Sequence, residues 1–184
     1  MKEKFLLIAL FLLLFVSAVS CQTNVATINE KSVSAEKSKP CEFLTPSDAE
    51  KILGQTVRLI ENTSKIEGDV SKSDCVYRGI SKDKVSGKDV NLYFSLERQE
   101  QNPTVEQARQ IFASTYKKIN EPALSVEVLS GIGDEAFSIS NPSNFHFIMV
   151  RKGEIIFRIK LNKATENTSL EELKAFAKKF AEQL

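Results

Sequence analysis

The chain of 184 residues is 42% hydrophobic and 27% charged, values that are ordinary for a protein with a packed core. After the first 21 residues, basic and acidic side chains are equal in number, so this part of the chain carries no net charge. A neutral chain lacks the basic excess that nucleic-acid binding requires, and it has no net charge with which to hold anionic lipid. The length suits one folded domain with additional segments.

An export signal is predicted at the N-terminus. Lys2 and Lys4 precede an uninterrupted apolar run at residues 5–16. As a helix this run would span roughly 18 Å, well short of the roughly 30 Å hydrocarbon core of a bilayer. Its length is typical of the hydrophobic region of a signal peptide.

The residues Ala18, Val19, Ser20 and Cys21 resemble the lipobox of bacterial lipoproteins. In that family the cysteine is modified with diacylglycerol, and the signal peptidase cuts just before it. The resemblance therefore implies a signal peptide at residues 1–20 and lipid on Cys21, although Ala18 replaces the family's usual leucine. Two alternatives stay open: an ordinary signal peptide cut after Ala18 or Ser20, and an uncleaved anchor, for which the apolar run is short.

Lipid on Cys21 would hold the protein on a membrane of the bacterial cell envelope. Each buried methylene contributes about 0.8 kcal/mol, so several acyl chains of palmitate length anchor a protein effectively permanently. Gln22 stands where inner-membrane lipoproteins of well-studied bacteria carry Asp, which favours the outer membrane in a cell with two membranes. Residues 21–40 contain no aromatic residue and no helical or strand period, so we expect a lipidated flexible tether.

Cys41 and Cys75 are the other two cysteines. Export would place them in an oxidising compartment, where an even pair usually forms a disulfide. In the chain-entropy model, closing a loop of about 34 residues would stabilise the fold by roughly 4 kcal/mol. Free thiols and a metal pair are the alternatives. A metal would need further ligands nearby, and the single histidine, His146, stands in no local cluster. We therefore predict a disulfide and no metal site.

The globular domain is predicted at residues 41–184, beginning with a short helix. Thr45 suits the N-cap of this helix, Pro46 its first turn and Gly54 its left-handed end. Capping boxes open two further helices. The helices are expected at residues 44–54, 104–119 and 169–184, and strands at residues 56–61, 74–80, 89–98, 124–129, 135–140, 144–151 and 154–161.

This order of elements predicts an α+β fold. Strands that follow one another with short turns pair antiparallel, so we expect a single antiparallel sheet with the helices packed on one face. The two halves could form a weak α-β-β-β repeat, although their sequences do not align convincingly.

Several short motifs together carry a second resemblance: residues 41–46, the helix that ends at Gly54, Cys75 before Val76 and Tyr77, and residues 131–136. In these the chain resembles exported bacterial domains that include lipoproteins of unknown function and the extracellular sensor domain of a mycobacterial serine/threonine kinase. The resemblance implies an α+β domain with a disulfide and a ligand-binding groove. It supplies no catalytic residues.

Gly131, Gly133 and Asp134 form a candidate binding loop. A dinucleotide-binding fingerprint would need a third glycine and a helix directly afterwards, whereas a strand is predicted here. We therefore interpret the loop as a tight strand connection, in which glycine supplies a positive φ and Asp134 bonds backbone nearby. No cofactor is predicted.

No sequence pattern of catalysis accompanies His146, which lies between two phenylalanines and is expected to be a packed or surface residue. We interpret residues 62–64 as a turn, residues 167–169 as a helix cap, and residues 82–88 as a solvated hairpin tip.

These observations favour a membrane-tethered, non-enzymatic domain that binds a ligand or a protein partner in the cell envelope. An envelope hydrolase whose unrecognised site is built from scattered Asp, Glu and Ser residues is the first alternative. A passive structural or antigenic surface lipoprotein is the second.

Overall fold

The computed structural model describes residues 40–101, 104–118, 124–141 and 144–184. The predicted signal peptide, Cys21 and the tether up to residue 39 lie outside the described residues. Within the described ranges, no helix is both long and apolar enough to cross a membrane.

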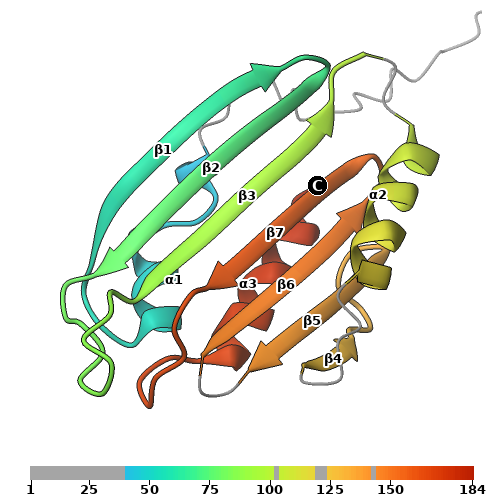
Figure 1. Ribbon diagram of the computed structural model, residues 1–184. Helices are drawn as coiled ribbons and strands as arrows, with labels where there is room; N and C mark the ends of the chain where they lie inside the picture. Colours follow the sequence, from blue (N-terminus) through green and yellow to red (C-terminus); the bar gives the residue numbers. More distant parts are fainter. Residues whose placement is uncertain (1–39, 102–103, 119–123, 142–143) are drawn as a thin grey trace, which may run out of the picture. The chain divides into compact units, whose positions relative to one another are not determined.

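The strands form one antiparallel sheet in the order β1-β2-β3-β7-β6-β5-β4 (Figure 1). The predicted order of helices and strands and the α+β class are confirmed. The elements are the 3-10 helix η1 (Pro40–Glu42), α1 (Pro46–Leu53), β1 (Val57–Glu67), β2 (Val70–Gly79), β3 (Asn91–Gln99), α2 (Val105–Lys118), β4 (Ser125–Val128), β5 (Glu135–Asn141), β6 (Phe145–Lys152), β7 (Ile155–Leu161) and α3 (Leu170–Ala181).

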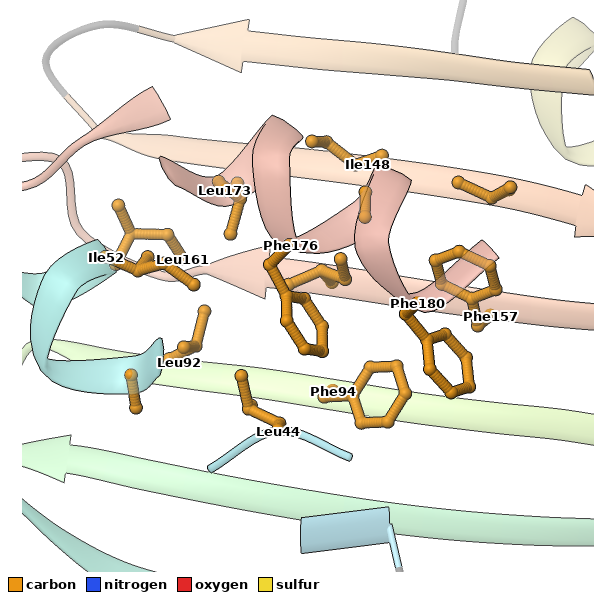
Figure 2. Packing of buried hydrophobic residues seen from close by; sticks show 14 of the residues in the cluster. Leu44, Ile52, Leu92, Phe94, Ile148, Phe157, Leu161, Leu173, Phe176 and Phe180 are labelled. Atoms are coloured by element: carbon orange, nitrogen blue, oxygen red, sulfur yellow. The ribbon is translucent and has the colours of Figure 1, made fainter. Parts of the chain in front are cut away.

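Two meanders, β1–β3 and β4–β7, meet where β3 pairs with β7. Helices α1 and α3 cover one face of the sheet, which we call the α1/α3 face. On this face the ring of Phe94 meets Phe157, Phe176 and Phe180 at centroid distances of 6.2, 5.4 and 5.0 Å (Figure 2). Such edge-to-face contacts add to the free energy of apolar burial.

Helix α1 begins and ends as its sequence predicts. Thr45 Oγ1 accepts a hydrogen bond from the amide of Asp48, whose carboxylate accepts one from the amide of Thr45. Gly54 ends the helix at φ 63°, and a Cβ there would lie 2.0 Å from the carbonyl oxygen of Asn167. Gly54 is therefore required both for its backbone conformation and for the close approach of the loop before α3. Ser169 caps α3 by accepting a hydrogen bond from the amide of Glu172, but the predicted capping box is incomplete, because the amide of Ser169 donates to the carbonyl oxygen of Ile52.

Helix α2 packs on the opposite face of the sheet, so the prediction that all helices share one face is wrong for α2 (Figure 1). The rings of Phe112 and Tyr116 lie 5.1 and 5.2 Å from that of Phe137, whose neighbour Ala136 belongs to the α1/α3 core. Successive residues of a strand point to opposite faces, so the two cores lie on the two sides of β5. We call this side the α2 face. The expected α-β-β-β repeat is not preserved, because α1 and α2 lie on opposite faces.

Strand β1 continues through residues 62–64, so the predicted turn there is wrong. Asn62, Thr63 and Ser64 pair with Cys75, Asp74 and Ser73 of β2, and the chain reverses at Gly68 instead. The prediction failed because β1 is exposed along most of its length and therefore lacks the apolar alternation that marks a half-buried strand.

The predicted disulfide between Cys41 and Cys75 is confirmed, with a Cα–Cα distance of 5.2 Å. It fastens η1 to the middle of β2, where Cys75 is fully buried.

Replacing both Cys41 and Cys75 by Ala should lower the free energy of unfolding by about 4 kcal/mol, because the unfolded chain loses a cross-link that closes a 34-residue interval. Denaturant unfolding measures this difference, and the wild type in reducing agent should unfold at nearly the same midpoint as the double variant. An unchanged midpoint in the double variant would contradict this stabilising role.

Candidate functional site

A cavity of about 470 Å³ lies between α2 and the loop that joins β4 to β5. Its lining is mainly apolar and includes the predicted binding loop. The lining residues are Phe112, Tyr116, Val128, Leu129, Ser130, Gly131, Ile132, Gly133, Asp134, Glu135, Ala136 and Phe137.

Aromatic rings form one wall of this cavity. Phe112 and Tyr116 lie four residues apart on α2, so both rings project from the same face of the helix and contact Phe137. Val128 is another lining residue and is 67% exposed. An apolar wall of this kind suits the apolar body of a ligand. Binding would release water from the apolar surfaces of both the ligand and the wall.

Two glycines shape the loop opposite. Gly133 has a φ of 61°, and a Cβ there would lie 2.5 Å from Val150 Cγ1 and 2.7 Å from the carbonyl oxygen of Arg151. This position therefore admits only glycine, because the loop lies directly against β6. Gly131 also has a positive φ, of 75°, but faces open space.

Asp134 fixes this loop to the β6–β7 hairpin through Arg151, whose side chain is only 3% exposed. Arg151 donates from Nη1 to Asp134 Oδ2 at 2.9 Å and from Nε to Glu135 Oε2 at 2.6 Å. The amide of Gly153 donates to the same Asp134 oxygen at 2.8 Å. This hydrogen bond from the Gly153 amide, together with the charge of Arg151, lowers the pKa of Asp134, whereas burial acts in the opposite direction. Asp134 therefore anchors the loop, but through the amide of Gly153 in the β6–β7 turn and not through the local backbone that the sequence analysis expected.

The N–H groups of Gly131 and Gly133 are free polar groups of the loop. No other described residue accepts a hydrogen bond from either of them. These groups can therefore donate to water or to an acceptor on a bound molecule.

Sequence reasoning identified Gly131, Gly133 and Asp134 but missed Arg151 and the two aromatic residues of α2. The signal for Arg151 was a charged residue directly after the apolar residues 147–150 of a predicted strand. Phe112 and Tyr116 belong to an apolar stripe of the helix predicted at residues 104–119, but a stripe does not show that one end of it borders a cavity.

His146 is 9% exposed, and its Nδ1 lies 3.0 Å from Ser140 Oγ. The two residues are directly opposite each other on β5 and β6, so the contact is a cross-strand pair. Burial, and next the charge of Lys174, lower the pKa of His146, which favours the neutral imidazole. A serine hydrolase also needs hydrogen-bond donors for the oxyanion that develops during its reaction. Ser140 and His146 lie within paired strands, where the backbone amides form the hydrogen bonds of the sheet.

A second cavity, of about 570 Å³, lies between the loop after β2 and the loop before α3. Its wall includes Ser81 and residues 82–85 of the predicted solvated tip. There Asp83 Oδ2 accepts hydrogen bonds from the amide and hydroxyl of Ser86, and Lys163 Nζ lies 3.8 Å away. These hydrogen bonds hold the tip in an ordered conformation. The Asp83 carboxylate is engaged in them and is not presented as a reactive group.

Among the described residues, no cluster of three or more His, Cys, Asp or Glu side chains could hold a metal ion. No protein-family model matches the chain, and comparisons with curated proteins and with solved structures found no match. The resemblances seen in the lipobox and in the short motifs therefore stay predictions.

Asp134→Asn should lower the free energy of unfolding by about 1–2 kcal/mol at pH 7, because it weakens the pairing of a buried guanidinium. The value is reduced for the partial exposure of the Asp134 side chain. The loss should shrink toward pH 3, since a carboxylate with a lowered pKa contributes above its unfolded pKa of about 4 and ceases to contribute as the pH falls through its folded value. Denaturant unfolding at both pH values measures the effect.

Asp89→Asn is the matched control. The Asp89 side chain is 36% exposed against 38% for Asp134, but its partner Arg78 is 30% exposed rather than buried. We expect a cost below about 0.5 kcal/mol for this control. Equal costs for the two variants would show that the burial of Arg151 does not matter.

Proposed function

We propose that this chain is a cell-envelope lipoprotein whose folded part binds a molecule with an apolar body, without catalysing a reaction. Lipid on Cys21 holds it on the membrane. The cavity between α2 and the β4–β5 loop receives either a small ligand or an apolar side chain of a protein partner. The cavity is the observation that carries this proposal, because it combines an apolar wall with unpaired amides on a loop held in place by Arg151.

The cavity is held in shape before anything binds. One wall is anchored by the buried Arg151, and Phe137 lies in the sheet itself. A ligand therefore loses little free energy to ordering of the site, which favours affinity. The apolar body would lie against Phe112 and Tyr116, and an acceptor such as a carbonyl or carboxylate oxygen would meet the loop amides.

The titratable groups support binding rather than hydrolysis. A general acid or base needs a pKa near the working pH, which for a carboxyl group means a raised value. Among the described residues, the carboxyl groups with a shifted pKa are Asp48, Glu67, Asp83 and Asp134, and each pKa is lowered. Hydrogen bonds and ion pairs that lower a pKa are typical of structural carboxylates.

The proposed location on a membrane of the cell envelope rests on three features of the chain. The lipobox at residues 18–21 supplies the acylated thiol, and the disulfide between Cys41 and Cys75 is typical of an exported protein. The neutral charge after residue 21 leaves acyl chains, rather than a basic surface, as the means of attachment.

Labelled palmitate supplied to producing cells should enter the wild-type chain, and intact mass of the extracted protein should show an acylated Cys21 with residues 1–20 removed. Cys21→Ser should abolish the label, because serine offers no thiol for the lipid. Replacing both Cys41 and Cys75 by Ser removes the disulfide but keeps Cys21, and should leave the label in place. Label retained by Cys21→Ser, or a mature wild-type mass without acyl groups, refutes the lipid attachment.

A neutral apolar fluorophore, Nile red, should bind the cavity, and Val128→Asp should weaken that binding at least tenfold by placing a charge in the lining. Ile80→Asp is the control, since Ile80 is 65% exposed against 67% for Val128 but belongs to neither cavity. Fluorescence titration gives both affinities. Equal binding by the two variants would show that the dye, and by extension an apolar ligand, does not use this cavity.

A further inference from the structure

Among the residues that the structure describes, none pairs with the outer edge of β1. This strand is eleven residues long, nine of them exposed, and it stands at the end of the sheet. Its ladder pairs it with β2 alone, and no backbone hydrogen bond joins its outer edge to another described residue. The strand at the other end, β4, has only four residues. An open edge of this length is a template on which another strand can pair.

Pairing with β2 divides the side chains of β1 between the two faces of the sheet. Residues opposite each other in a ladder share a face. Glu61, Thr63, Lys65 and Glu67 pair with Val76, Asp74, Lys72 and Val70, and Arg58 pairs with Arg78, all on the α2 face. Leu59 and Ile66 pair with Tyr77 and Ser71 and lie on the α1/α3 face.

A bulge interrupts this register between Leu59 and Glu61, so that Ile60 is an extra residue. Ile60 therefore has no counterpart in the ladder, and any strand added at the outer edge meets Leu59 and Glu61 at successive positions.

We propose that β1 pairs antiparallel with β1 of a second copy of this chain, about a two-fold axis through Thr63. Lys65 of each copy then lies opposite Glu61 of the other. Beyond the bulge, Ile66 lies opposite Leu59, and Glu67 lies opposite Arg58. The symmetry repeats every contact, which gives four pairs of opposite charge and two apolar pairs.

The neighbouring registers lack this complementarity. With the axis at Asn62, Lys65 lies opposite Arg58. With the axis at Ser64, Glu67 lies opposite Glu61. Both alternatives set like charges directly across from each other, which destabilises strand pairing. Charge order along β1 thus selects the register at Thr63.

The apolar side chains add to the stability of this register. Leu59 is 50% exposed and Ile66 is 67% exposed, and each would cover the other in the dimer. Lysines and bulges also occur on edges that avoid pairing. In β1, however, opposite charges lie across from each other when two copies of the strand run antiparallel, and this distinguishes β1 from such an edge. A single pair of strands buries little area, so the dimer is expected to be weak and reversible, with a dissociation constant roughly in the micromolar range.

Thr63→Cys in the full-length chain tests the axis directly. Opposed Cβ atoms lie about 4.5–5.5 Å apart in antiparallel strands, so mild oxidation should join two copies through residue 63. Non-reducing electrophoresis would show a band of twice the chain mass. Val128→Cys is the control, because Val128 is also exposed but lies on β4 at the far edge. It should give at least tenfold less dimer.

A charge exchange in the Thr63→Cys chain tests the register. Glu61→Lys alone places lysine opposite Lys65, and Lys65→Glu alone places glutamate opposite Glu61, so each should reduce cross-linked dimer at least tenfold. The two changes together restore opposite charges and should restore the dimer. Circular dichroism confirms folding, which these exposed positions should not disturb.

Three results would overturn the proposal. The first is a yield from Thr63→Cys no higher than from Val128→Cys. The second is failure of the double exchange to recover the dimer. The third is cross-linking of residue 63 to a different protein, which would make β1 an edge for a foreign strand.

Discussion

The antiparallel pairing of β3 with β7 is the constraint on which the rest of the structure depends. It joins two meanders that are each built from neighbouring segments of sequence, and it places Phe94 and Phe157 where Phe180 of α3 can contact both. Burying one such ring contributes about 2–3 kcal/mol. Because β7 comes last in its meander yet lies at the centre of the sheet, β4 is pushed to one edge and β1 is left at the other.

This arrangement gives the α2 face two unlike halves. Over β5 and β6 the face is apolar and is covered by α2. Over β1, β2 and β3 it is polar, with Arg158 donating to Glu97 and Ser95 donating to Asp74 across the strands. The cavity occurs beside the β4–β5 loop, where part of the apolar half meets solvent. It is thus a consequence of a single helix covering part of a wide sheet.

The features predicted correctly from sequence are those that depend on neighbouring residues or on a simple pairing of residue types. The caps at Thr45 and Gly54 need only local bonds, and the disulfide joins the two cysteines that follow the N-terminal segment. The face on which α2 packs was not predictable, because an apolar stripe shows that a helix is buried but not against which side of a sheet. The ion pair between Arg151 and Asp134 joins residues 17 apart through a hairpin, and no local pattern encodes it.

That ion pair determines which ligands the cavity can favour. Glu135 is shared between Arg151 at 2.6 Å and Arg109 at 3.8 Å, and Asp134 is engaged by Arg151, Lys152 and the amide of Gly153. The two carboxylates of the lining are therefore already neutralised by the protein's own cations. A cationic ligand would have to displace an existing partner, so its charge would add little to affinity. Apolar area against the α2 rings and acceptors for the loop amides are then the interactions left to distinguish one ligand from another.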